Sequence, residues 1–120
     1  MIDVDDIEEA EILLDIVEDK NINCSVLQTN NGMHFYFKGY DLTANKIKWY
    51  SNIGIHCDYK LGIKNTADLL KINGQVRKWL RKCEDHDPLP AWLYPYNKKN
   101  PNLAKLQMVT DVTINYLLIY

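Results

Sequence analysis

The sequence begins MIDVDD (residues 1–6), and this stretch determines what the rest of the chain has to supply. Apolar and acidic residues alternate in it, as they do in a β-strand with one buried face. Because successive side chains of a strand point to opposite faces, we expect Asp3 and Asp5 on one face and Ile2 and Val4 on the other. Two carboxylates on one face form a candidate site for a hard divalent cation such as Mg²⁺. An acidic strand end that faces water has the same pattern.

The chain has the size and composition of one ordinary folded domain. It contains 120 residues, of which 47% are hydrophobic and 25% are charged, and these values exclude the disordered and collagen-like classes. No apolar run approaches the ~20 residues that a membrane helix needs, and no signal peptide precedes the first strand. Three widely spaced cysteines fit reduced thiols. We therefore expect a cytoplasmic protein with no membrane partner.

Charge is distributed unevenly along the chain. Nine of the 16 acidic residues, but only one of the 14 basic residues, lie within residues 1–20. Such a distribution can place metal ligands and a surface for a polyanion in one molecule. An acidic helix that is solvated on one side explains it equally well.

Residues 7–20 are predicted to form an amphipathic helix. Asp6 and Glu9 have the spacing of a capping box, which favours Asp6 as a helix cap over a third metal ligand. Apolar residues recur at helical spacing and predict the buried face: Ile7, Ala10, Leu13, Leu14 and Val17.

Two Asn-Gly pairs predict β-hairpins. Residues 23–29 and 33–38 flank Asn31-Gly32, which suits a two-residue turn with positive φ angles, and residues 67–72 and 75–80 flank Asn73-Gly74. In the strand 33–38, one face should be core and the other polar, and the polar face carries His34, Tyr36 and Lys38.

The remaining segments are predicted from shorter patterns. Residues 53–60 alternate and place Asp58 on a polar face, whereas residues 44–50 suggest a short helix. The prolines of residues 88–95 favour an extended strap whose aromatic side chains pack on the body of the protein. Residues 102–120 are apolar and suggest a C-terminal helix.

This order of elements indicates an α+β fold, with an antiparallel-rich sheet packed with helices, of the ferredoxin-like or RNA-recognition-like kind. If the strands that carry Asp3 and Asp5, His34, and Asp58 are neighbours, three carboxylates and an imidazole lie together on one face. Nucleotidyl transfer that uses metal ions needs this inventory, because carboxylates anchor the cations and a basic group holds the triphosphate.

Three segments resemble, in order, the signature motifs of archaeo-eukaryotic-type primases, in particular the bifunctional primase-polymerases of phages and mobile elements. They are IDVD (2–5), TNNGMHFYF (29–37) and CDYK (57–60). In that family, the first motif is an acidic strand, the second ends in a histidine that contacts nucleotide phosphate, and the third supplies another acidic metal ligand.

The resemblance implies a role for each matching residue. Asp3, Asp5 and Asp58 would be the catalytic residues and would bind Mg²⁺ or Mn²⁺, while His34 and Lys60 would bind the nucleoside triphosphate. The implied activity is that of a nucleotidyltransferase module that primes DNA replication on a single-stranded DNA template.

The resemblance covers residues 1–95, the expected catalytic module with its RNA-recognition-like primase-polymerase core. The module that usually precedes the first motif in this family is missing from the chain, so we expect a truncated enzyme. Residues 96–120 are expected to form a C-terminal helical segment that packs on the module. A phage-encoded protein of this kind would lie in the host cytoplasm.

A non-catalytic function is the alternative. A phage-encoded scaffold derived from a primase could bind nucleic acid, a replication protein or a host-defence complex, in the manner of an anti-CRISPR protein. Basic residues from 60 to 82, with Tyr59 and Trp79 among them, suggest a surface for a single strand, although solvated hairpin residues explain them equally well. Cys83 and His86 lack the second ligand pair of a convincing zinc site. An exposed sheet edge would favour a homodimer.

Overall fold

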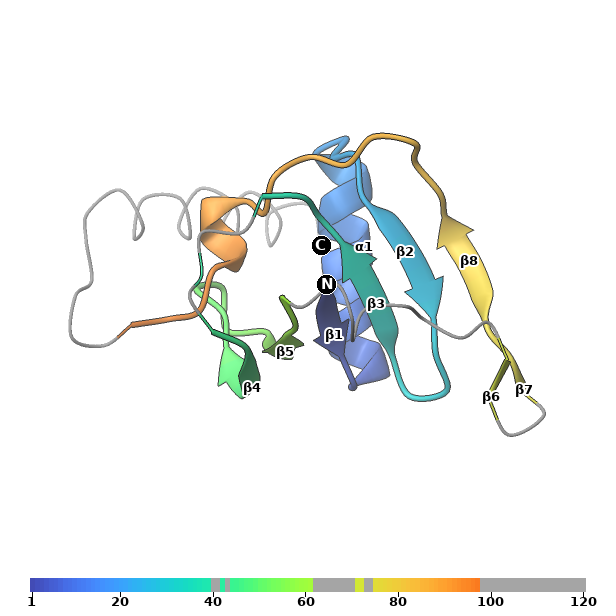
Figure 1. Ribbon diagram of the computed structural model, residues 1–120, viewed down its shortest axis with the longest axis horizontal. Helices are drawn as coiled ribbons and strands as arrows, with labels where there is room; N and C mark the ends of the chain where they lie inside the picture. Colours follow the sequence, from blue (N-terminus) through green and yellow to red (C-terminus); the bar gives the residue numbers. More distant parts are fainter. Residues whose placement is uncertain (40–41, 43, 62–70, 73–74, 98–120) are drawn as a thin grey trace.

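In the computed structural model of this chain, the first strand lies inside a six-stranded antiparallel sheet (Figure 1). The structure describes residues 1–39, 42, 44–61, 71–72 and 75–97. The elements in these residues are β1 (Ile2–Val4), α1 (Ile7–Asp19), β2 (Ser25–Gln28), β3 (Met33–Tyr36), β4 (Lys46–Tyr50), β5 (His56–Tyr59), β6 (Lys71–Ile72), β7 (Gln75–Val76), β8 (Lys78–Arg81) and the 3₁₀ helix η2 (Ala91–Leu93). The strand order of the sheet is β4-β5-β1-β3-β2-β8, so the predicted α+β class is confirmed.

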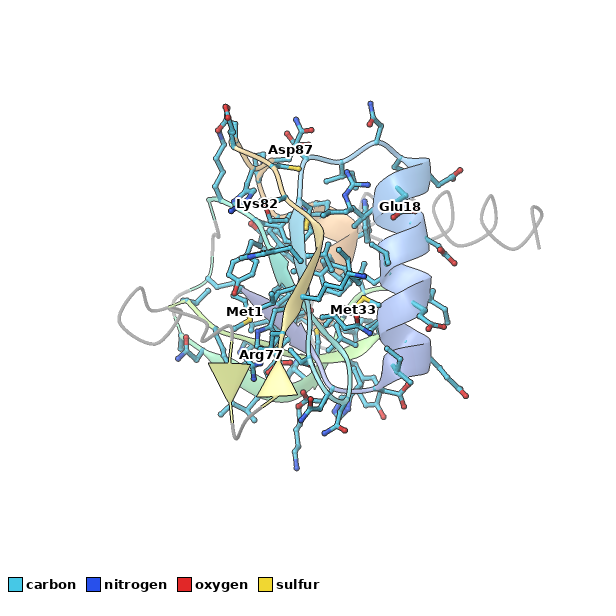
Figure 2. All side chains as sticks on the ribbon, turned by 90° about the vertical axis from the view of Figure 1, so that its right-hand side faces the viewer. Met1, Glu18, Met33, Arg77, Lys82 and Asp87 are labelled. Atoms are coloured by element: carbon cyan, nitrogen blue, oxygen red, sulfur yellow. The ribbon has the colours of Figure 1, made fainter. Side chains whose placement is uncertain are left out.

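Helix α1 covers one face of this sheet. Figure 1 shows α1 behind β1 and β3, and Figure 2, turned by 90°, shows it as a separate layer with Met33 lying between the two. Strands β1 and β2 run in the same direction, because each pairs antiparallel with β3, which lies between them. The connection from β1 through α1 to β2 is therefore a split β-α-β unit.

The predicted helix is confirmed with one change in its buried face. The side chain of Asp6 caps α1 by accepting a hydrogen bond from the backbone N–H of Glu9 (3.1 Å). The helix buries Ala10, Leu13, Ile16 and Val17. Ile7 is 40% exposed, contrary to prediction, because the inward stripe begins one turn later and includes Ile16 instead.

The hairpin between β2 and β3 is confirmed, but its predicted turn is wrong. Neither Asn31 nor Gly32 has a positive φ angle. Four residues connect the strands; the backbone N–H of Thr29 donates to the Gly32 carbonyl (3.0 Å), and the Gly32 N–H donates to Thr29 Oγ1 (3.1 Å). The glycine serves another purpose, because a Cβ at Gly32 would lie 1.7 Å from the carbonyl oxygen of Val4.

The helix predicted within residues 44–50 is wrong, since these residues contain β4. β-Branched and aromatic side chains occupy Ile47, Trp49 and Tyr50, and they suit a strand that pairs with β5. The register shifts between Lys46 and Trp49, which leaves an extra residue in β4, and Lys48 takes a φ of 52° there. The edge strand therefore contains a β-bulge.

The strap at residues 88–95 packs on the body of the protein as predicted. Pro88 and Pro95 form isolated bridges to Lys38 and Ser51, and η2 lies between them. Trp92 is buried, and Tyr94 packs against the core.

The second hairpin is present as β6 paired with β7, but the predicted strand 75–80 is wrong, because it divides at Arg77 into β7 and β8. Residues 67–70 and the Asn73-Gly74 turn lie outside the described residues. β8 begins after Arg77 and joins the main sheet beside β2. Residues 98–120, with the predicted C-terminal helix, also lie outside the described residues. In the described part of the chain, no helix has both the length and the apolar character needed to cross a bilayer.

The face of the sheet that turns away from α1 carries a row of side chains from five strands. Cross-strand pairing aligns Asp58 with Asp3, Asp3 with His34, His34 with Leu27, and Leu27 with Trp79. We call this the open face because it lies opposite α1, although Asp3, His34 and Leu27 are buried on it. The adjacent row, from Tyr59 through Ile2 and Phe35 to Val26, belongs to the core on the α1 side. The sheet thus separates the row that contains the polar side chains of Asp58, Asp3 and His34 from the wholly apolar core row.

Candidate metal centre

Three carboxylates meet on the open face of the sheet. Asp3 lies on the central strand β1, Asp58 lies directly opposite it on β5, and Asp5 directly follows β1. One oxygen from each of the three lies within 4.8 Å of the others. In the described part of the chain, this acidic trio is the only group of three or more potential metal ligands. The structure therefore brings together the three residues that the sequence predicted as metal ligands.

Asp3 is the buried member of the trio. Its side chain is 8% exposed, Oδ2 lies 3.3 Å from Lys60 Nζ, and Oδ1 lies 3.3 Å from His34 Nε2. Apart from this contact with His34, Oδ1 has no hydrogen-bond partner among the described residues. Burial by itself would raise the pKa of Asp3, but His34 and Lys60 outweigh it and lower the pKa from 3.8 to about 2. Asp3 is therefore a carboxylate at neutral pH, with one buried oxygen available.

Asp5 is the exposed member of the trio. Partial burial, followed by the negative charges of Asp3 and Asp58, raises the pKa of Asp5 above its ordinary value of 3.8. It also borders a polar cleft of about 550 Å³ between the start of α1 and the β2–β3 hairpin. Repulsion within the trio is the electrostatic condition that a bound cation would relieve.

The bulge in β4 holds Asp58 in place. The backbone N–H of Lys48 donates a hydrogen bond to Asp58 Oδ1 over 2.6 Å. A non-glycine residue with a positive φ costs about 1 kcal/mol, and here this conformation accompanies a charge-assisted hydrogen bond to the carboxylate. This contact was not predicted, because a bulge depends on the pairing of two strands and leaves no local mark in the sequence.

Gly32 positions the end of β1. A Cβ at this position would overlap the Val4 carbonyl, so no larger residue fits without a shift of the backbone. Asp5 is the next residue after Val4, so the hairpin sets where the third carboxylate lies. The Asn-Gly pair in the sequence marked this glycine, but for a turn conformation that it does not adopt.

His34 and Lys60, the predicted nucleotide-binding residues, both contact Asp3. His34 is 6% exposed, whereas the Lys60 side chain is 35% exposed at the rim of the trio. The structure therefore brings both residues to the predicted site, and their contact with a nucleotide stays a prediction.

The donor set fits a hard divalent cation. All three ligands are carboxylates, which Mg²⁺ and Mn²⁺ prefer, and the charge of Lys60 balances only one of them. Asp3, which belongs to the trio, has a buried oxygen, Oδ1, with no hydrogen-bond partner among the described residues, and a metal ion bound by Asp3 could satisfy it. The same contacts with His34 and Lys60 also describe a structural ion-pair cluster that needs no metal.

The weaker site candidates are not assembled as ligand groups. Cys24 and Cys57 are buried, and burial raises the pKa of each thiol to about 12, so they are inert core residues. His86 Nε2 lies 2.7 Å from Ser25 Oγ, which also accepts a hydrogen bond from the Cys83 N–H. This cluster fixes the segment after β8 to β2.

The suggested basic and aromatic surface is only partly present. Tyr59 lies in the core, where its hydroxyl donates to the Leu93 carbonyl (2.7 Å), so it cannot stack on a ligand. Arg81 donates to the Ile22 carbonyl (3.0 Å). Trp79 lies on the open face, where its ring centroid is 5.7 Å from that of Tyr36.

Comparison of the chain with models of protein families, with curated proteins and with solved structures found no significant match.

Proposed function

We propose that this protein is a metal-dependent nucleotide-binding module of the primase-polymerase kind, which transfers nucleotides onto a primer in DNA replication. The observation that carries the proposal is the alignment of Asp58, Asp3 and His34 on three neighbouring strands, with Asp5 beside them. All four matching motif residues thus lie in one site, although they are up to 55 positions apart in the chain.

The strand order supports the finer fold assignment within this proposal. In a ferredoxin-like or RNA-recognition-like domain, the third strand lies between the first two, and the last strand flanks the first. The order β5-β1-β3-β2 has this arrangement, with β5 as the last strand. In the proposed assignment, β4 and β8 extend the domain at its two edges, and β4 stands where a second helix is usual.

Each residue of the site has a distinct part in the proposed reaction. Asp3, Asp5 and Asp58 would hold Mg²⁺ or Mn²⁺, which neutralises phosphate charge and polarises the phosphoryl oxygen when bound. His34 fixes Asp3 from the buried side. Lys60 lies at the rim, where its ammonium can contact a triphosphate oxygen beside the carboxylates.

The test compares two neighbouring aspartates. Asp5→Asn removes one carboxylate of the trio, whereas Asp6→Asn makes the same change at a helix cap, where asparagine caps equally well. Wild type and Asp6→Asn should both bind a nucleoside triphosphate with Mn²⁺ and should both extend a primer on single-stranded DNA. We expect Asp5→Asn to lose about a hundredfold or more in extension. Equal extension by the two variants would refute the proposal.

A non-catalytic scaffold is the second candidate, and two contacts of Asp3 favour it. Lys60 already balances the charge of Asp3, and His34 contacts its other oxygen, so the buried part of the cluster needs no cation. Such a scaffold would use its surface to bind nucleic acid, a replication protein or a defence protein. It predicts that Asp5→Asn leaves partner binding unchanged and that neither protein binds Mn²⁺ with nucleotide.

A further inference from the structure

A groove of about 680 Å³ lies at the β4 edge of the sheet and is not used by the trio itself. Its size falls in the range of ligand sites, ~300–1,000 Å³. Among the described residues, no acidic residue lines it. Aromatic and lysine side chains dominate its lining: Lys46, Lys48, Trp49, Tyr50, Tyr94 and Tyr96. We call this the aromatic groove.

The aromatic rings of the groove are accessible. Tyr50 is 60% exposed, Trp49 is 44% exposed and Tyr96 is 37% exposed, which is unusual for large apolar side chains on one edge. Two contacts hold rings of the groove in position. The Trp49 indole N–H donates to the Tyr96 carbonyl (3.1 Å), and the ring of Tyr50 packs on that of His56 with 4.7 Å between the ring centroids. The rings of Trp49 and Tyr50 are thus anchored rather than loose.

The lysines make the groove positive. Lys46 Nζ lies 4.7 Å from the centre of the Trp49 ring, and the Lys48 side chain is exposed. Flat rings for stacking, interleaved with cations for phosphates, are the features by which proteins bind single strands without reading their sequence. An acidic protein partner would use the lysines but would leave the tryptophan and tyrosine faces without a matching group.

The edge itself is poorly suited to pairing with another strand. The backbone N–H of Tyr96 donates to the Tyr50 carbonyl (2.8 Å), so the end of β4 is already paired. The bulge at Lys48 and the lysines on either side of Ile47 interrupt the rest, as is common where edges are protected from aggregation. A homodimer formed through β4 is therefore disfavoured.

We infer that the aromatic groove binds a single strand of nucleic acid. Lys48 links the groove to the trio, because its side chain lines the groove while its backbone N–H donates to Asp58. A strand in the groove would pass beside the acidic site. Its identification as the template rests on the proposed nucleotidyl transfer, but its binding to the groove does not.

The test measures binding of a fluorescein-labelled oligo(dT) strand by anisotropy in EDTA, without nucleotide, so that loss of the metal site cannot affect it. We expect Trp49→Ala to weaken binding about tenfold or more, through loss of stacking. The double variant Lys46→Gln/Lys48→Gln should also weaken binding. The negative slope of log K against log salt should become shallower by about 1.4, since two phosphate contacts are lost. Asp5→Asn, which removes a negative charge beside the path of the strand, should bind at least as tightly as wild type.

The opposite edge provides the matched control. Lys78 and Lys82 are exposed on and beside β8, and Lys82 Nζ lies 5.8 Å from the centre of the Trp79 ring, so Lys78→Gln with Lys82→Gln removes the same charge beside another tryptophan. Figure 1 shows β8 at the far edge from β4. Lys82 and Arg77 flank β8 at its two ends (Figure 2). We expect this control to retain most of the affinity.

Three outcomes would overturn the inference. They are absence of binding by wild type, equal affinity of Trp49→Ala and wild type, and a larger loss in the β8 control than in the β4 variant, which would assign the strand to Tyr36 and Trp79 instead. Thermal unfolding of each variant shows whether a loss reflects the groove or the fold. Trp49→Phe, which keeps a ring, should restore binding if stacking is its cause.

Discussion

The backbone N–H of Lys48 and the carboxylate of Asp58 are joined by a 2.6 Å hydrogen bond across the edge of the sheet. The bond exists because a bulge turns this one amide toward β5, at a φ of 52°. Residues with an unfavourable backbone conformation are often found at functional sites, and here the residue at that position donates a hydrogen bond to a carboxylate. The relationship therefore leads to a prediction about stability.

Replacement of Lys48 by glycine should stabilise the protein relative to replacement by alanine. Both changes remove the side chain, but only glycine removes the cost of the positive φ, so we expect a difference of about 1 kcal/mol in the free energy of unfolding. Urea unfolding of the two variants measures it. Equal stability would show that the bulge does not hold this conformation in solution.

Gly32→Ala should destabilise the protein by about 1–3 kcal/mol, because its Cβ would overlap the Val4 carbonyl oxygen and push β1 away from the hairpin. Asn31→Ala is the control; it lies in the same turn, is exposed and has no positive φ, so it should change stability by less than about 0.5 kcal/mol. If Asn31→Ala lost more stability than Gly32→Ala, the result would contradict this contact and favour the two-residue turn predicted from the sequence.

Asp3 should make the fold sensitive to acid. Its pKa is lowered from 3.8 to about 2 on folding, so it contributes stability above pH ~4 that is lost as the pH falls toward 2. The shift corresponds to about 2 kcal/mol. Urea unfolding between pH 6 and pH 2 should show this loss in wild type and a smaller one in Asp3→Asn, which is already less stable at pH 6. Parallel profiles would mean that His34 and Lys60 do not stabilise the charged carboxylate.

Asp5 should have the opposite effect on stability. Its pKa is raised by burial and by its two neighbours, so the charged form destabilises the fold above its folded pKa, and this penalty disappears below pH ~4. We expect Asp5→Asn to gain up to about 1 kcal/mol at pH 7 without metal. With Mn²⁺ present, wild type should be more stable than Asp5→Asn, because a cation that binds only the folded wild-type protein stabilises it. An unchanged order with Mn²⁺ in thermal unfolding would argue for a structural cluster.

Much of the architecture could be predicted from local patterns. Alternation in residues 2–5 and around His34 and Asp58 assigned each side chain to a face, and a face is preserved whatever the strand order. The alignment of Asp3 with both His34 and Asp58 depended on β1 lying between β3 and β5. The alternation of residues in a single sequence does not indicate which strands are neighbours, so this strand order could be expected only from the resemblance to a known family.

The features that were missed depend on contacts between distant segments. β4 carries an irregular pattern because its bulge breaks the alternation, and the short run around Ala44 suggested a helix instead. Gly32 was identified for the wrong reason, since its approach to Val4 is a tertiary contact. The aromatic groove combines Trp49 and Tyr50 with Tyr94 and Tyr96, which are more than 40 residues away in the chain.

Titration of Mn²⁺ into wild type, Asp5→Asn, Asp58→Asn and Asp6→Asn by calorimetry tests the metal site most directly. We expect saturable binding to wild type and to Asp6→Asn, weaker binding to Asp58→Asn and none to Asp5→Asn, with all four proteins folded. The Asp6 variant loses the same charge two residues past β1 and thus separates coordination from general electrostatic attraction. Equal binding to wild type and Asp5→Asn, or no binding to wild type, would contradict the assignment of the acidic trio as a metal centre.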